Sequence, residues 1–300
     1  METIPVSLRQ IAYLLAVAEE GSTAAAARRM NVSQPSVSLA VAKFEAGLGQ
    51  PMFVRLPGQG MAPTAVGARK LGEMRALLRH ARAVLAPAGE DAEGGELVLG
   101  VLSTLGPRYA PQLVSRFRAR HPSARVRIVE GHLDDLSAGL RSGRIELALV
   151  YDFALPSDLA ILPLADVRPY GLVWPGHRLE RAGAVRLADL LEDPLVLMGL
   201  PQSRDYFLSL IQSQGARAKI AFETGSLEML RSAVANRMGV GLLATDLPYD
   251  LTYDGGRIGR VPLAGDLPPH RVALASNPSI PQGPVARAFE AQARAVIAGQ

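Results

Sequence analysis

The sequence contains no cysteine in its 300 residues. Disulfide bonds, thiolate metal ligands and a thiol redox switch are therefore excluded. No apolar run is long enough to cross a membrane, and the first ten residues, METIPVSLRQ, lack the basic and apolar regions of a signal peptide. We therefore expect a cytoplasmic protein with no membrane partner.

Recognisable catalytic motifs are also missing. The chain has neither a G-x-S-x-G sequence nor a P-loop. Its five histidines occur singly, without the spacing of metal ligands, at His80, His121, His132, His177 and His270. Without a convergent catalytic set, the sequence predicts no enzyme, no cofactor and no metal site. Two other classes are kept as alternatives to the interpretation developed below, namely a cytoplasmic solute-binding protein and an enzyme on a two-lobed α/β scaffold. A secreted solute-binding protein would need an export signal.

Charge is unevenly distributed along the chain. Residues 1–87 hold ten Lys or Arg and five Asp or Glu, whereas residues 88–300 hold 22 and 23. A basic N-terminal third on a near-neutral remainder is typical of a polyanion-binding module attached to a body that binds small molecules or proteins. The length, with 48% hydrophobic residues, is enough for two or three domains with their own cores.

The stretch from Gly21 to Arg55 predicts two short helices joined by a tight turn. Residues 23–30 are rich in Ala, the best helix former, and Asn31 tolerates the left-handed conformation in which many helices end. Ser33 then supplies an N-cap oxygen, and Pro35 falls in the first turn, where its missing N–H costs nothing.

The second of these helices has one apolar and one polar side. The apolar side is Val37, Val41, Phe44 and Leu48, and the polar side is Gln34, Ser36, Ser38 and Lys43. A short helix, a tight turn and a second helix with a polar side form a helix-turn-helix. We therefore expect a DNA-binding regulator.

Segments on both sides extend this domain. Ser7 and Gln10 form a capping box at the start of a first helix, which Gly21 ends. Residues 50–64 alternate around a turn of Pro and Gly, which predicts a two-stranded wing. Arg55 is placed to reach a phosphate or the minor groove.

A long helix is predicted from its N-cap, Thr64, to about Leu85, with Pro87 ending it. It carries apolar residues at spacings of 3, 4, 3 and 4, namely Leu71, Met74, Leu78, Ala81 and Leu85. This spacing is typical of a coiled-coil seam and favours pairing of two chains. Packing of the helix on its own domain is the alternative. Residues 88–95, AGEDAEGG, are expected to form a hinge.

After residue 95 the pattern changes to alternating strands and helices. Strands are expected at 96–101, 125–130, 147–151, 171–174, 195–198, 219–223, 240–243 and 270–276, and helices at 107–120, 134–142, 204–214, 227–236 and 284–297. This alternation predicts an α/β body with a parallel-containing sheet and helices on both faces.

Short motifs between residues 33 and 64 follow one another in a specific order. They are Ser33-Gln34-Pro35-Ser36-Val37-Ser38, Phe44-Glu45, Leu48-Gly49, Phe53-Val54-Arg55, Gly60-Met61 and Thr64. In this order and spacing the sequence resembles the N-terminus of LysR-type transcriptional regulators, and a looser likeness continues through the remaining chain. Two positions depart from the family. Gln59 stands where an arginine is common, and Leu39-Ala40 stands where basic or polar residues are frequent, which indicates fewer charged DNA contacts.

The resemblance implies a complete architecture. Residues 1–64 would form a winged helix-turn-helix, 65–87 a linker and dimerisation helix, 88–95 a hinge and 96–300 an effector-binding domain like periplasmic binding proteins. Lobe 1 would take about 96–163 and 269–300, and lobe 2 about 164–268. The resemblance further implies a homodimer, a homotetramer through the effector domains, and RNA polymerase as a partner if the protein is an activator.

The expected DNA contacts lie on the helix-turn-helix and the wing. Gln34 and the serines on the polar side can read base edges, with Gln to adenine the better-defined pairing. Other hydroxyl and basic side chains are assigned to phosphates, which position the protein without specifying sequence. The full set is Thr23, Ser33, Gln34, Pro35, Ser36, Ser38, Lys43, Arg55 and Thr64. For Ser33, a role as a pure helix cap is equally consistent.

A second site is expected between the lobes. Three polar pairs lie between a strand and a helix, namely Ser103 and Thr104, Gln202 and Ser203, and Thr224 and Ser226. Hydroxyls beside helix N-termini bind anions, although each pair is also explained as a plain helix cap. The resemblance adds His132, Phe153 and Pro201 as wall positions. We therefore expect a small-molecule effector, an organic anion whose identity the sequence leaves open.

Overall fold

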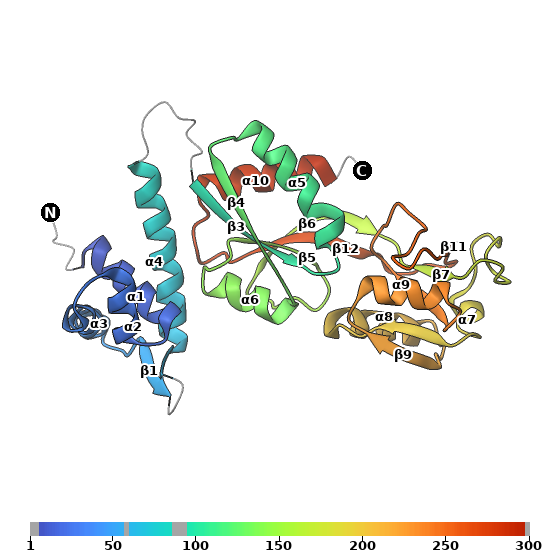
Figure 1. Ribbon diagram of the computed structural model, residues 1–300, viewed down its shortest axis with the longest axis horizontal. Coiled ribbons are helices and arrows are strands. Elements are labelled where there is room, and N and C mark those ends of the chain that lie inside the picture. The colour runs from blue at the N-terminus through green and yellow to red at the C-terminus, as the bar shows by residue number, and fades with distance from the viewer. Residues whose placement is uncertain (1–5, 57–59, 86–94, 298–300) are drawn as a thin grey trace.

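The computed structural model describes residues 6–56, 60–85 and 95–297. Three hydrophobic cores lie in this part of the chain, one in an N-terminal helical domain and one in each of two α/β lobes. Figure 1 shows the three bodies in a row, with the long helix α4 between the helical domain and the first lobe. The sequence predictions for Gln59, Pro87 and the hinge at 88–94 fall outside the described residues.

The N-terminal domain is a winged helix-turn-helix. Its elements are α1 (Leu8–Glu20), α2 (Thr23–Met30), α3 (Gln34–Leu48), β1 (Phe53–Leu56) and β2 (Gly60–Pro63). The capping box of Ser7 and Gln10 is present, and Gly21 and Asn31 end their helices with φ of 68° and 52°. Ser33 caps α3, and the two strands pair antiparallel. The local predictions for this domain are confirmed.

The linker helix α4 (Ala65–Val84) packs against the helical domain of its own chain. Leu71 and Met74 are only 1% and 4% exposed, in the same core as α1 and α3, and Leu78 packs on its edge. These three residues are therefore used within the chain, as the alternative interpretation held. The exposed apolar residues of this segment are Leu77, Val84 and Leu85 at 47%, 70% and 79%.

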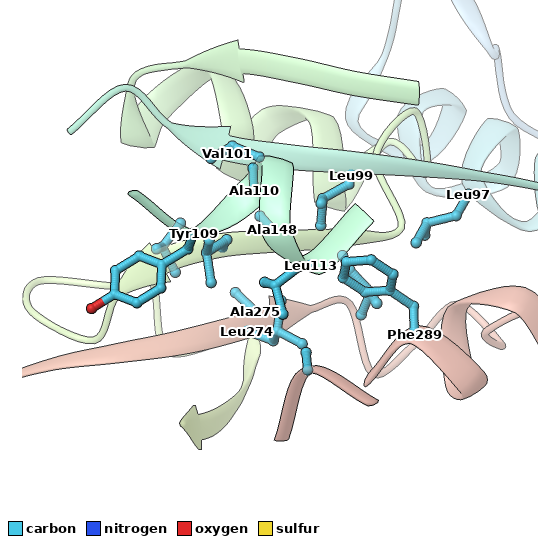
Figure 2. Close-up of a cluster of buried hydrophobic side chains, with 14 of the residues drawn as sticks. Leu97, Leu99, Val101, Tyr109, Ala110, Leu113, Ala148, Leu274, Ala275 and Phe289 are labelled. Carbon is cyan, nitrogen blue, oxygen red and sulfur yellow. The ribbon is translucent and has the colours of Figure 1, made fainter. Parts of the chain in front are cut away.

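Lobe 1 is a five-stranded mixed sheet with the order β4-β3-β5-β12-β6. Its elements are β3 (Gly95–Leu102), α5 (Gly106–Arg120), β4 (Ala124–Gly131), α6 (Leu133–Arg141), β5 (Leu147–Tyr151), β6 (Ala160–Val167), β12 (His270–Ser276) and α10 (Pro284–Ile297). Helices α5 and α10 lie on one side of the sheet and α6 on the other (Figure 1). Figure 2 shows side chains of β3 and β12 meeting Leu113 of α5 and Phe289 of α10 in the core between them.

Lobe 2 is a second five-stranded sheet, in the order β11-β7-β10-β8-β9. Its elements are β7 (Tyr170–Val173), α7 (Leu187–Leu190), β8 (Leu195–Met198), α8 (Pro201–Ser213), β9 (Ile220–Thr224), α9 (Leu227–Ala235), β10 (Val240–Leu243) and β11 (Gly259–Pro262). Strands β8, β9 and β10 are parallel to one another, and β7 runs antiparallel to β10. The predicted two-lobed α/β class is confirmed.

Strand β6 (Ala160–Val167) is the main element that the sequence interpretation missed. It contains Pro163, and a proline inside a run argues against a central strand. The strand tolerates it because β6 is an edge strand that pairs only with β12 among the described strands. Lobe 1 therefore extends to Val167, and the chain first crosses to lobe 2 at residues 168–169 and not after residue 163.

Of the described helices, none is both long and apolar enough to cross a membrane.

Candidate functional sites

The predicted DNA-reading helix α3 is open to solvent along its outer side. Ser33, Gln34, Pro35, Ser36 and Lys43 are exposed, and Ser38 is partly exposed. Gln34 Nε2 lies 3.4 Å from the hydroxyl of Thr23, and the Ser33 and Ser36 hydroxyls lie 2.7 Å apart. These groups come together as a polar edge around the start of α3.

Thr64 has a structural role that limits it as a phosphate contact. Its hydroxyl donates to the carbonyl of Pro51 at 2.9 Å and accepts the N–H of Gly67 at 2.9 Å. One hydroxyl thereby ties the wing to the start of α4. Arg55, by contrast, is exposed on β1 and keeps the position predicted for a DNA contact.

Glu45 positions the wing, a role that sequence reasoning missed. Its Oε1 accepts the backbone N–H groups of Met52 and Phe53 at 2.7 and 3.2 Å. Ion pairs join α1 to α2, where Arg29 contacts Glu19 at 2.6 Å and Glu20 at 3.0 Å. The first contact fixes the wing against α3, and the second fixes α2 against α1.

A narrow cavity lies between the lobes, where the sequence predicted the second site. Its lining includes Thr104 of lobe 1 and Ser203 of lobe 2, with Tyr151, Thr245 and His270. The cavity volume of about 10 Å³ is room for about one water molecule. A larger ligand therefore requires the lobes to move apart.

Three of the predicted effector contacts are buried oxygens whose hydrogen-bonding capacity is unused. Ser103 Oγ, Thr104 Oγ1 and Gln202 Oε1 have no hydrogen-bond partner among the described residues. The Gln202 amide nitrogen donates to the carbonyl of Phe153, which links α8 to the segment after β5. A buried polar atom without a partner costs free energy, which a ligand that supplies the missing bond recovers.

The alternative interpretation as helix caps does not hold for two of the polar pairs. Helix α5 begins at Gly106 with Leu105 as N-cap and no side-chain cap bond, so Ser103 and Thr104 do not cap it. Helix α8 begins at Pro201, three residues earlier than predicted, which puts Gln202 and Ser203 inside its first turn. The side chains of both pairs are therefore not engaged in helix capping.

The remaining predicted wall residues divide into two groups. Phe153 packs edge-on to Tyr206 with ring centroids 5.5 Å apart, next to the cavity. His132, Pro201 and Thr224 do not line the cavity; the first two are exposed, and the Thr224 hydroxyl accepts the N–H of Ser226 at 3.2 Å. Ser226 itself caps α9, as predicted.

An aromatic stack across the lobes was missed from the sequence. The ring of His270, at the start of β12, lies 3.8 Å from Tyr151 of lobe 1 and 3.8 Å from Tyr206 of lobe 2, centroid to centroid. The Tyr151 hydroxyl bonds the Thr245 hydroxyl at 2.6 Å. Burial lowers the pKa of His270 to about 3 and raises the pKa of Tyr206 to about 12. The stack is therefore neutral at physiological pH.

Two models of protein families match the chain and together account for both parts. The bacterial regulatory helix-turn-helix of the lysR family matches residues 8–68, and the LysR substrate-binding domain matches residues 90–298. The chain belongs to the LysR family of transcriptional regulators. It is therefore a DNA-binding regulator with an effector-binding domain and not an enzyme, which confirms the function class predicted from the sequence.

Individual LysR-family proteins support the same assignment. The chain is 30% identical to the regulator CfxR of Cupriavidus necator over 274 residues, which is 87% of this chain and 82% of CfxR. It is 31% identical to CbbR of Xanthobacter flavus over 258 residues, 83% of this chain and 76% of that one. The crystal structure of HinK, a LysR-family regulator of Pseudomonas aeruginosa, matches with a TM-score of 0.67 and 32% identity over 98% of this chain and 100% of HinK.

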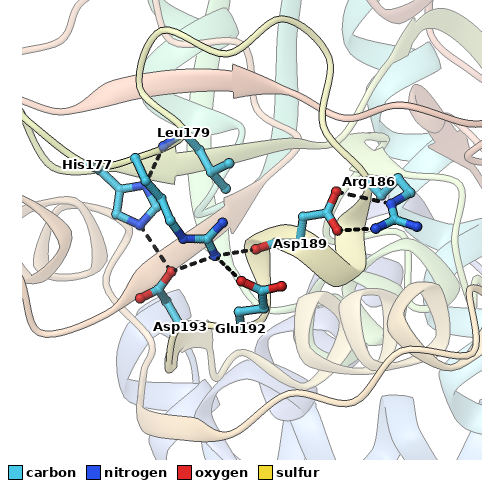
Figure 3. A network of polar contacts seen from close by, with 7 residues as sticks. His177, Leu179, Arg186, Asp189, Glu192 and Asp193 are labelled. Carbon is cyan, nitrogen blue, oxygen red and sulfur yellow. Dashed lines mark hydrogen bonds and ion pairs between the residues drawn. The ribbon is translucent and has the colours of Figure 1, made fainter.

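One polar cluster of this LysR-family chain contains a His–Asp pair of the kind found in catalytic sites. His177 Nε2 lies 3.1 Å from Asp193 Oδ2, and Arg178 contacts Asp193 and Glu192 (Figure 3). The other ring nitrogen, Nδ1, accepts the backbone N–H of Leu179 at 3.1 Å, so both nitrogens are used in holding the loop after β7. The cluster is structural, in agreement with the family assignment.

The linker helix of this LysR-family chain also docks on lobe 1, which no sequence pattern indicated. Arg75 donates to the carbonyl of Ser142 at 2.5 Å, and Arg79 Nε lies 3.0 Å from Glu146 Oε2, whose side chain is 4% exposed. Burial lowers the pKa of both arginines and raises that of Glu146. Glu146 immediately precedes β5, and β5 ends at Tyr151 in the cleft. A single strand thus connects the linker contact to the cavity.

Proposed function

We propose that this LysR-family regulator binds promoter DNA sequence-specifically and that a small organic anion, held between the lobes, alters that binding. The observation that supports the effector site is three buried oxygens without partners among the described residues, Ser103 Oγ, Thr104 Oγ1 and Gln202 Oε1, of which Thr104 lines the cavity between the lobes. The two hydroxyls can donate to an anion, whereas the amide oxygen only accepts. An organic anion that also carries a hydroxyl or amino donor fits this set.

The charge of the effector is argued from what surrounds the cavity. None of the described residues that line it is acidic, and Ser203 lies in the first turn of α8, where backbone N–H groups and the helix dipole favour negative charge. Since the closed cavity is small, the anion must prefer an arrangement with the lobes further apart. A ligand changes DNA binding only through such a preference between states.

Replacing Ser103 and Thr104 by Ala should remove the effector response and leave DNA binding intact. The oxygens that an anion would engage are deleted, whereas the DNA contacts lie in another domain. A panel of small carboxylic acids, including hydroxy acids, is screened by thermal shift, because a ligand at a hundred times its Kd stabilises by about 2.7 kcal/mol. Operator affinity is then measured with and without the strongest acid.

Ser123→Ala is the matched control for that double variant. Ser123 Oγ is also buried without a partner among the described residues, but it lies before β4, at the opposite end of the sheet from the cavity. It should respond to the acid as the wild type does. A double variant that still responds fully would place the effector site elsewhere.

Sequence-specific DNA binding is tested through Gln34. Genomic fragments that the full-length protein retains give a cognate duplex, and Gln34→Ala should weaken that duplex by ~1–3 kcal/mol, the value of a bidentate base contact. Its affinity for random DNA should barely change, because phosphate contacts are kept. Equal losses on both duplexes would show that Gln34 reads no base.

We also propose that the protein acts as a homodimer through the exposed side of α4, and as a homotetramer through the effector domains. Of the predicted seam, Leu71 and Met74 are buried within the chain, whereas Leu85 is exposed together with Leu77 and Val84, and these three form the proposed contact. A monomeric mass in light scattering at micromolar concentration contradicts this assembly. We further propose RNA polymerase as a partner if the protein is an activator. Because its proposed target is promoter DNA, we propose that the protein acts in the cytoplasm.

A further inference from the structure

The recognition helix α3 has an exposed leucine at the centre of its outer side. Its inner side is Val37, Ala40 and Val41, which are 0%, 3% and 6% exposed. With about 3.6 residues per turn, the direction opposite to these three falls on Pro35, Leu39, Ala42 and Ala46. All four of these residues are exposed, and Leu39 is 68% exposed. No other large apolar side chain of the described helix-turn-helix and wing exceeds 44%.

The polar residues predicted to read bases lie beside this centre and not on it. Gln34 and Ser36 are at the start of the helix, where Gln34 contacts Thr23 and Ser36 contacts Ser33. Lys43 lies on one flank. When α3 enters a major groove, the side chain directed at the base edges at mid-helix is therefore that of Leu39.

Leu39 has no evident role in folding. It is absent from the residues that form or pack on the core of its domain, whereas Phe44 and Leu48 of the same helix do pack there. An isolated exposed leucine is unremarkable on an ordinary surface. On the face that enters the groove, however, it will be desolvated against whatever base edge it meets.

The chemistry of the groove then selects the base. Most groups on the base edges in the major groove are hydrogen-bond donors and acceptors, and burying one against a leucine leaves it without a partner. The C5 methyl group of thymine is the apolar exception. We propose that Leu39 contacts a thymine methyl group and thereby specifies a T·A pair within each half-site. This inference rests on the proposed sequence-specific binding and adds a base preference to it.

The test removes the methyl group from the DNA and the leucine from the protein. A cognate duplex is selected from a random pool with the full-length chain, and each thymine of one half-site is replaced singly by uracil, which lacks only the C5 methyl. At one position uracil should weaken wild-type binding about fourfold, the effect of one buried methyl group. Leu39→Ala should bind the thymine duplex more weakly and should show no difference between thymine and uracil at that position.

Two further variants separate reading from helix stability. Leu39→Met keeps an apolar side chain of similar reach and should retain most of the uracil effect. Lys43→Ala lies on the same helix and should weaken all duplexes alike, with the uracil effect unchanged. If the protein selects no duplex over random DNA, the proposed function fails, and this inference with it. If a duplex is selected but every thymine tolerates uracil, or if Leu39→Ala keeps the uracil effect, the Leu39 contact alone is overturned.

Discussion

Gly67→Val is expected to abolish operator binding while the effector lobes stay folded. A Cβ at Gly67 would lie 2.0 Å from the carbonyl oxygen of Met52 and 2.9 Å from its carbonyl carbon. That backbone cannot yield, because the same carbonyl accepts the N–H of Thr64 at 2.9 Å and the Met52 N–H donates to Glu45 at 2.7 Å. The valine side chain would push α4 away from the Met52 backbone. It would also disturb the hydrogen bonds by which Glu45 of α3 holds the start of the wing. We expect the free energy of unfolding of the N-terminal domain to fall by ~3 kcal/mol or more. Overpacking costs most where the neighbouring atoms cannot move, as here.

Gly47→Ala is the control for that substitution. Gly47 is also a helical glycine, in α3, but no heavy atom lies within 4 Å of the position its Cβ would take. Alanine there should stabilise the domain by roughly 1 kcal/mol through helix propensity. Thermal unfolding followed by circular dichroism reports all domains, and the fluorescence of Trp174, the single tryptophan, reports lobe 2. If Gly67→Val binds DNA with wild-type affinity, the close approach of α4 to the Met52 backbone is not needed for DNA binding.

Local interactions explain why the helix-turn-helix was predictable. Helix caps depend on residues three or four positions apart, so Ser7, Ser33, Asn31 and Gly21 each act as the sequence indicated. The wing was predicted from prolines and glycines between two short runs of the sequence, and the two runs do pair as antiparallel strands. None of these elements needs a distant part of the chain to define it.

The linker helix shows where sequence periodicity is ambiguous. Spacings of 3 and 4 identify an apolar side of α4 but not the partner that covers it. Leu71 and Met74 are covered by the helical domain of the same chain. That outcome depends on Gly67 letting the helix approach the Met52 backbone, a contact between residues that no repeat connects.

The sequence predicted a polar region between the lobes but not the residues that fill it. Polar residues at the ends of strands pointed to this region, and of the four predicted there Thr104 and Ser203 line the cavity between the lobes. The stack of Tyr151, His270 and Tyr206 was missed because His270 is far along the chain from both tyrosines, and no local pattern connects them. Its formation requires the second crossing to bring His270 back between the lobes.

The buried position of His270 in that stack should make the free energy of unfolding fall at acidic pH. Its folded-state pKa is about 3, lowered by burial from an ordinary value of 6.5. Between these pH values the unfolded chain binds a proton that the folded chain excludes. Stability from this residue is therefore complete above pH 6.5 and is lost as the pH falls, by ~1.4 kcal/mol per unit. At pH 4.5 the loss amounts to ~2.7 kcal/mol.

His270→Phe should remove this dependence while keeping an aromatic ring between Tyr151 and Tyr206. Urea unfolding is measured for both proteins from pH 7.5 to 4.5, and the difference between them isolates the histidine from the carboxylates that titrate in both. His80→Gln, at an exposed position of α4, serves as the control and should follow the wild type. The wild type should lose stability relative to His270→Phe only below pH 6.5. If the difference in free energy of unfolding between the two proteins stays constant across this range, the His270 ring accepts its proton in the folded state. The cleft must then open to water in a way that this arrangement of the lobes does not allow.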